Sequence, residues 1–174
     1  MTKKEFLNTV SNGKVDILQI FLDTISAVNT EYCIIGGLAV NAYVEPVVSL
    51  DLDIIIATKD IERVCEAAAE HFKIQRFVHS INLSSSESDL RIQLQTDSRY
   101  QNFIPRAKFR NVLGYDMKVA DVKDVLKGKI WAYSDTERRM SKRQKDLADI
   151  LRLIESFPDL MNQLPDTIRN KIEL

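Results

Sequence analysis

The sequence predicts an α+β fold, in which a mixed sheet is flanked by helices and followed by a C-terminal helical part. Apolar strand-like runs are concentrated between residues 32 and 119, and they do not alternate regularly with helices as a doubly wound fold requires. From residue 121 onward the pattern becomes helical. We expect a single domain over residues 1–174, with a sheet-containing core at about 14–119 and the helical part at about 120–174.

The first half of the chain predicts a succession of helices and strands. In order, these are a helix over 15–28, a strand over 32–35, a short helix over 38–44, a strand over 50–57 and a helix over 59–72. Apolar residues at helical spacing indicate the first helix, and apolar β-prone runs indicate both strands. Gly36-Gly37 ends the first strand, and Pro46 stops the short helix because the residue before a proline avoids the helical region. Alanine enrichment supports the last helix.

The second half predicts strands first and helices afterwards. The strands are expected over 74–81, 90–95, 107–113 and 117–119, and the helices over 121–133, 136–156 and 167–172. Asp121 is the expected N-cap of the first of these helices, with Asp124 in its first turn. The serine-rich segment 84–88 indicates an exposed turn.

Composition excludes several classes of protein. The chain has 174 residues with 24 basic and 25 acidic side chains, so its net charge of −1 argues against a generally basic nucleic-acid binder. No apolar run approaches the roughly 20 residues that span a bilayer, and the N-terminal segment lacks the apolar stretch of a signal peptide. Cys33 and Cys65 lack metal-ligand spacing, so we expect buried free thiols. These features predict a cytoplasmic protein without a membrane partner.

Two aspartates mark the second strand as the place where chemistry is expected. Asp51 and Asp53 are two residues apart, so in a strand their side chains share one face, with Cα atoms about 6.6 Å apart. Leu52, Ile54 and Ile56 point to the other face, toward the core. Adjacent carboxylates repel each other, and a shared proton, a basic partner or a divalent cation relieves that repulsion. Carboxylate oxygens suit Mg²⁺, which binds through one or two of them together with substrate phosphates.

A pair of glycines precedes the acids. Without Cβ atoms, Gly36 and Gly37 allow the backbone to approach a ligand closely. The helix expected to begin at Leu38 directs free N–H groups and its positive dipole end toward the same place, which favours a phosphate. Each feature alone is more often structural, because Gly-Gly is commonly a plain turn and Asp-x-Asp a solvated or salt-bridged face. Together, in this order, they indicate metal-assisted attack on a nucleoside triphosphate.

The order of these motifs resembles the nucleotidyltransferases of the DNA polymerase-β superfamily. Their signature is Gly-Gly or Gly-Ser, a spacer of about this length, and then Asp-x-Asp or Asp-x-Glu. The resemblance is closest to the AbiEii/AbiGii toxin-like branch, whose opening looks like Gly36-Gly37-Leu38-Ala39 and whose acid pair looks like Asp51-Leu52-Asp53. A later helical motif of that branch looks like Lys129, Arg138 or Arg139, and Lys145-Asp146-Leu147-Ala148-Asp149.

The resemblance implies a nucleotidyltransferase-like sheet and a set of site residues. Asp51 and Asp53 would hold Mg²⁺ or Mn²⁺, Gly36, Gly37 and Ser49 would cradle the NTP, Lys129 and Lys145 would reach its β- and γ-phosphates, and Asp146 would orient a basic group or assist the acceptor. The implied reaction moves a nucleoside monophosphate from an NTP to a hydroxyl of an RNA, a protein or a small molecule. The branch also implies a bacterial, cytoplasmic toxin of a toxin-antitoxin or abortive-infection system, with a cognate antitoxin as partner.

The chain departs from the superfamily pattern at two places. The third acid of the superfamily, which helps to hold the metal and can deprotonate the attacking hydroxyl, falls at Gln93. Asp97 is the acid that we expect to take its place as a catalytic residue. Relatives in this branch often carry an arginine shortly before the acid pair, where this chain has Val47 and Val48.

Three hypotheses therefore stand side by side. The first is an active nucleotidyltransferase. The second is a catalytically degenerate fold of the same kind that binds a nucleotide or a partner, and Gln93 motivates it. The third takes the basic run from Arg138 to Lys145 as a docking surface for protein or RNA, although that run also fits a solvated helix face with charge pairs four residues apart.

Overall fold

The computed structural model describes residues 1–172, in which seven strands form one mixed sheet. The strands are β1 (Tyr32–Ile35), β2 (Asp51–Ile56), β3 (Lys73–Arg76), β4 (Ser80–Ser85), β5 (Ser88–Gln95), β6 (Lys108–Val112) and β7 (Tyr115–Val119). They lie in the order β3-β4-β5-β2-β1-β7-β6. β2 is antiparallel to β1 and parallel to β5, and β1 is parallel to β7. The α+β class and the mixed sheet expected from the sequence are confirmed.

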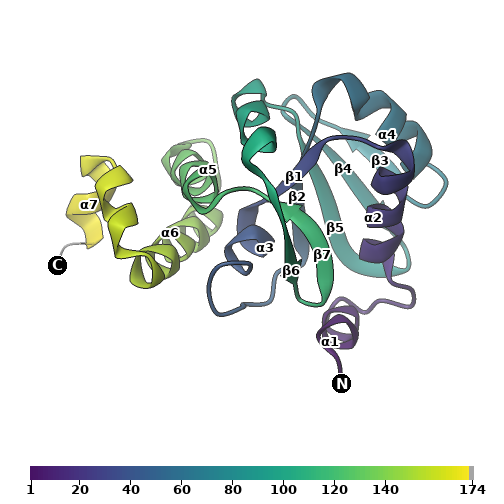
Figure 1. Ribbon diagram of the computed structural model, residues 1–174, viewed down its shortest axis with the longest axis horizontal. Helices are drawn as coiled ribbons and strands as arrows, with labels where there is room; N and C mark the ends of the chain where they lie inside the picture. Colours follow the sequence, from purple (N-terminus) through teal and green to yellow (C-terminus); the bar gives the residue numbers. More distant parts are fainter. Residues whose placement is uncertain (173–174) are drawn as a thin grey trace.

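Helices cover both faces of this sheet. They are α1 (Lys3–Val10), α2 (Ile17–Val28), α3 (Gly36–Val40), α4 (Ile61–Ala68), α5 (Val122–Ser134), α6 (Met140–Ser156) and α7 (Asp166–Ile172), with 3-10 turns η1 (Thr58–Asp60), η2 (Ser98–Arg106) and η3 (Pro158–Gln163). α2 and α4 lie on one face, and α3 lies on the other, toward α5 and α6 (Figure 1). The C-terminal helices extend from there, away from the sheet (Figure 1).

The centre of the core lies at β1 and β2. All four residues of β1 are buried, and so are Leu52, Ile54 and Ile55 of β2. Central strands that are covered on both faces have such nearly continuous apolar runs. Leu52, Ile54 and Ile56 lie on the face of β2 opposite the two acids. A slip of one residue would turn Asp51 and Asp53 into that buried face, so its burial fixes the register that presents both acids on the α3 side.

One predicted strand is a hairpin. The run expected over 74–81 divides into β3 and β4, and the N–H of Phe77 donates to the carbonyl of Ser80 at 2.8 Å across the turn. The single-strand prediction was wrong because this turn contains exposed Phe77 and Val78 rather than the glycine or proline that usually marks a reversal. The serine-rich segment does form a turn, between β4 and β5, as expected.

The sequence analysis did not anticipate the N-terminal helix α1. The Thr2 hydroxyl accepts from the N–H of Glu5 at 3.2 Å, and the Glu5 carboxylate accepts from the N–H of Thr2. This reciprocal pair is a capping box, so the Thr-x-x-Glu spacing was a usable signal for α1.

Several helix boundaries also differ from expectation. α3 includes the diglycine as its first turn, whereas the expected helix began at Leu38. α6 begins four residues later than expected, because the Asp135 carboxylate accepts from the N–H of Glu137 at 3.0 Å and holds the chain in a turn. The N-cap at Asp121 is confirmed by its bond from the N–H of Lys123 at 2.9 Å. Within residues 1–172, every helix is too short or too polar to traverse a lipid bilayer.

Candidate active site

The glycine turn and the acid pair touch each other. β1 pairs with β2 so that Ile35 lies opposite Asp53, and Gly36 follows directly with a φ of +70°. A Cβ atom at Gly36 would lie 2.9 Å from the Cγ atom of Asp53, so only glycine leaves room for this carboxylate. At Gly37 a Cβ would lie 3.3 Å from the Ser49 hydroxyl. The structure therefore brings together the four residues that the sequence placed in separate motifs.

Asp53 is held in an unfavourable environment for a charge. Among residues 1–172, its carboxylate accepts no hydrogen bond and forms no ion pair, and it is half-buried. Burial raises its pKa above the ordinary value of 3.8, the nearby Lys129 ammonium opposes that rise, and the Asp51 carboxylate adds to it. An unpaired carboxylate of this kind gains most from a bound cation.

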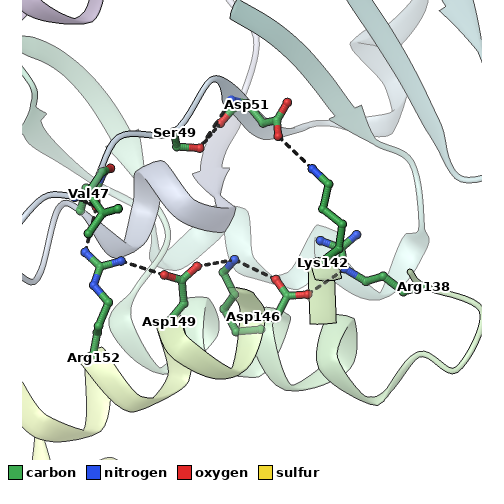
Figure 2. Close-up of polar contacts among 10 residues, drawn as sticks. Val47, Ser49, Asp51, Arg138, Lys142, Asp146, Asp149 and Arg152 are labelled. Atoms are coloured by element: carbon green, nitrogen blue, oxygen red, sulfur yellow. Dashed lines mark hydrogen bonds and ion pairs between the residues drawn. The ribbon is translucent and has the colours of Figure 1, made fainter. Parts of the chain in front are cut away.

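Asp51, by contrast, is already paired. One of its oxygens lies 2.8 Å from an Arg91 guanidinium nitrogen, and the other lies 3.3 Å from the Lys142 ammonium (Figure 2). The Arg91 side chain is 62% exposed and that of Lys142 is 36% exposed, so these are surface ion pairs that contribute about 0–1 kcal/mol each. A ligand of higher charge can displace them.

The structure places Gln93 beside the acids. β5 runs parallel to β2 so that Gln93 lies opposite Asp53 and Arg91 lies opposite Asp51. Asp97, the expected substitute acid, lies beyond the end of β5, where it caps η2 and pairs with Arg99 at 2.8 Å. Arg99 holds the pKa of Asp97 below its usual value. Asp97 lines a cavity next to that of Asp53, so its catalytic role stays a prediction.

A second charged cluster joins α5 to α6. The residue Lys129 is 8% exposed, and its ammonium lies 3.0 Å from Asp146 and 2.7 Å from Asp149. Asp146 is 1% exposed and also pairs with Arg138 at 2.7 Å (Figure 2). Burial alone would lower the pKa of Lys129, but Asp149 and Asp146 together raise it. Asp146 thus contacts two basic side chains, and its role toward a nucleotide or an acceptor stays a prediction.

The sequence analysis missed the link between this cluster and the loop before β2. Arg152 pairs with Asp149 at 2.7 Å (Figure 2). It also donates to the Asn41 side chain at 3.1 Å and to the Glu45 carbonyl. Asn41 in turn donates to the Val47 carbonyl at 2.7 Å and accepts from its N–H at 3.0 Å. The spacing of Arg152, three residues after Asp149 on one helix, was the only local signal.

The basic run from Arg138 to Lys145 is not a uniform surface. Arg138 and Lys142 pair with site aspartates, and Arg143 donates to the Tyr133 carbonyl at 2.7 Å. Lys145 is exposed and, within residues 1–172, forms no ion pair or hydrogen bond through its side chain. Most of the run therefore faces the site, and Lys145 offers a free ammonium at its edge.

These groups line one cleft between α3, β2 and the C-terminal helices. Its acidic side chains are Asp51, Asp53, Asp146 and Asp149, and its basic side chains are Lys129, Arg138, Lys142, Lys145 and Arg152. Gly37, Val47, Val48 and Ser49 also line it.

The acid pair fits a divalent cation only together with a substrate. Among residues 1–172 no group of three or more His, Cys, Asp or Glu side chains could hold a metal. Mg²⁺ needs only one or two protein carboxylates when phosphate oxygens complete its shell. Asp53, unpaired and seated against Gly36, together with Asp51 meets that requirement with oxygen donors alone.

Among known proteins, the chain is similar to solved structures that share its fold. No family model matches the sequence, and no curated protein matches it. The crystal structure of ANT(2")-Ia in complex with adenylyl-2"-tobramycin matches with a TM-score of 0.61 at 11% identity, over 89% of this chain and 94% of that chain. The lincomycin-bound lincosamide antibiotic adenylyltransferase LnuA matches with a TM-score of 0.56 at 12% identity, over 81% and 98% of the two chains.

A third solved structure also matches this fold. An antigenic nucleotidyltransferase-like protein from Paracoccidioides brasiliensis has a TM-score of 0.52 at 17% identity, over 88% of this chain and 78% of that chain. At these identities the likeness concerns the fold, and it does not extend to the toxin-like branch. The chain has the fold of the nucleotidyltransferases.

Proposed function

We propose that the protein is a metal-dependent nucleotidyltransferase that moves a nucleoside monophosphate from an NTP to an acceptor. The observation that carries this proposal is the unpaired Asp53 carboxylate seated against Gly36 in a cleft rich in basic side chains. Asp51 and Asp53 would hold Mg²⁺ or Mn²⁺, which would neutralise the triphosphate and make its α-phosphorus more electrophilic.

The chain's own residues have separate tasks in this proposal. Gly36 and Gly37 leave the backbone open to the triphosphate, and the Ser49 hydroxyl stands over Gly37. Lys145 lines the cleft and has no side-chain partner within residues 1–172, and it would bind the β- and γ-phosphates. Lys129 is held by two carboxylates, which supports a positioning role; direct contact with phosphate stays a prediction.

The acceptor and the biological role are less constrained. The matched structures include a lincomycin complex and an adenylyl-tobramycin complex, which supports a small-molecule acceptor for this fold. An RNA acceptor, a toxin role, an antitoxin partner and a cytoplasmic, bacterial setting stay predictions that rest on the motif resemblance.

A second candidate function is a degenerate nucleotidyltransferase fold that binds nucleotide without turnover. Its specific support is Gln93, which lies opposite Asp53 where an acid would be needed to take a proton from a hydroxyl. The two candidates share the same nucleotide site and differ only in turnover.

Label transfer separates these candidates. The protein is incubated with each nucleoside triphosphate labelled at the α-phosphate, with Mg²⁺ and with total RNA or a small-molecule extract. We expect transfer that disappears in Asp53→Asn and persists in Asp116→Asn, a matched change on β7 away from the cleft. Tight NTP binding without transfer supports the degenerate binder, and absence of metal-dependent NTP binding contradicts both.

A further inference from the structure

A second cleft lies on the strand side of the acid pair. It measures about 250 Å³ and is lined by Asp51, Asp53, Asn82, Arg91, Gln93, Arg138 and Lys142. Asn82 of β4 lies opposite Gln93 of β5, and Gln93 lies opposite Asp53 of β2. Two amides and one acid therefore form a row across the sheet, and a molecule in this cleft would lie against Asp53 on the side away from β1.

The two amides have unused hydrogen-bonding capacity. Among residues 1–172, neither the Asn82 nor the Gln93 side chain forms a hydrogen bond. The Asn82 oxygen is buried and has no partner. The amide nitrogens of Asn82 and Gln93 can donate to an anion in the cleft.

Three cations surround this row. Arg91 and Lys142 each bind one oxygen of Asp51, and Arg138 binds Asp146. If a divalent cation bound both oxygens of the Asp51 carboxylate, Arg91 and Lys142 would lose their shared partner. Together with Arg138 these side chains give the cleft three cationic groups beside the acid pair, so an anion that enters the cleft meets positive charge.

No side chain in this cleft can act as a base for a hydroxyl. Asn82 and Gln93 are amides that cannot accept a proton, Arg91, Arg138 and Lys142 are cations, and the two remaining groups, Asp51 and Asp53, are the proposed metal ligands. We infer that the cleft binds a phosphate monoester, and that the nucleophile is an oxygen of that phosphate. This inference rests on the proposed function and names its acceptor class.

The chemical step then needs no proton transfer. A phosphate monoester has its second pKa near about 6, so the attacking oxygen is already ionised at neutral pH. It forms a bond to the α-phosphorus of the NTP while the bond from that phosphorus to the α–β bridging oxygen breaks. Pyrophosphate leaves with the bonding electrons, and the product is a phosphoanhydride between the acceptor phosphate and the nucleoside monophosphate.

Calorimetric titration tests this inference without turnover. Ribose 5-phosphate and ribose, and a 5′-phosphorylated and a 5′-hydroxyl RNA dinucleotide, are titrated into the full chain with Mn²⁺ and a non-hydrolysable NTP analogue. We expect the phosphorylated member of a pair to bind at least about tenfold more tightly, and whichever pair shows the preference identifies the source of the phosphate. Arg91→Gln should remove most of this preference, whereas Arg91→Lys should retain part of it.

A matched arginine provides the control. Arg76 on β3 is also an exposed strand residue paired with a carboxylate at 2.8 Å, but it lies outside the cleft. Arg76→Gln should leave the preference unchanged, and thermal unfolding verifies that each variant is folded. Equal binding of both members of both pairs, while the NTP analogue still binds, overturns the phosphate acceptor and leaves the proposed function intact. Failure of the NTP analogue to bind contradicts the proposed function itself.

Discussion

Asp53 and Asp146 line the same cleft, yet their charges are balanced in opposite ways. Asp146 is almost fully buried and carries two short ion pairs, to Lys129 and Arg138. Asp53 is half-buried and, among residues 1–172, has no partner at all. Paired charges hold α5 against α6 as a structural frame, whereas the unpaired acid belongs to the proposed metal site.

The largest effect is expected from breaking the frame. Asp146→Ala leaves Lys129 with a single partner and Arg138 with none, and loss of one partner in a buried cluster costs about 3–5 kcal/mol. Urea unfolding measures this free energy. Glu155→Ala, an exposed change on the same helix, should alter stability by no more than about 0.5 kcal/mol. A loss below about 1 kcal/mol for Asp146→Ala would show that the cluster is not a structural frame.

Filling the glycine turn should come next. Gly36→Ala introduces a Cβ at a positive φ and against the Asp53 carboxylate, so we expect a loss of about 2–4 kcal/mol together with loss of nucleotide binding. Gly37→Ala is the matched control, because its Cβ meets only the Ser49 hydroxyl, and it should cost about 1 kcal/mol or less. Equal losses for the two variants would mean that the contact with Asp53 is unimportant.

Removing the charge of Asp53 should stabilise the protein. Because burial raises its pKa in the folded state, the ionised form opposes folding at neutral pH. Below the ordinary pKa of 3.8 the acid is protonated in both states and makes no difference; the penalty grows as pH rises from there to the raised pKa. Asp53→Asn should therefore unfold at a higher temperature than the wild type at pH 7, and the gain should shrink as pH falls. A lower unfolding temperature at pH 7 would contradict the unpaired state of Asp53.

The smallest effects are expected at the pairs on Asp51. Lys142→Gln and Arg91→Gln each remove one partially exposed ion pair, so the free energy of unfolding should change by less than about 1 kcal/mol. Denaturant titration of each variant measures it. A loss comparable to that of Asp146→Ala would place Asp51 in the frame rather than in the proposed metal site.

Local patterns were enough to predict that the glycine turn and the acid pair meet. The apolar run of β2 fixes the face of Asp51 and Asp53, and Gly36-Gly37 directly follows β1, so adjacency of β1 and β2 brings the turn to the acids. The frame and the second cleft could not be predicted in the same way. Arg152 meets Glu45 across 107 residues, and the contact of Arg91 with Asp51 depends on the parallel register of β2 and β5.

The remaining differences have similar causes. The β3–β4 turn carries Phe77 and Val78 instead of turn residues, so the reversal is visible only in the antiparallel pairing of β3 with β4. The position of Asn82 beside Gln93 depends on the antiparallel register of β4 and β5, which no local pattern indicates. Long-range pairing therefore decides which polar residues gather at the site.

The central claim is that Asp53 is kept unpaired in order to bind a metal-bound nucleotide. Titration of a non-hydrolysable NTP analogue with Mn²⁺ into the wild type and Asp53→Asn at neutral pH tests it most directly. We predict a loss of affinity of at least about 100-fold in a variant that is as stable as the wild type or more stable. Undiminished, Mn²⁺-dependent binding in folded Asp53→Asn would contradict the claim.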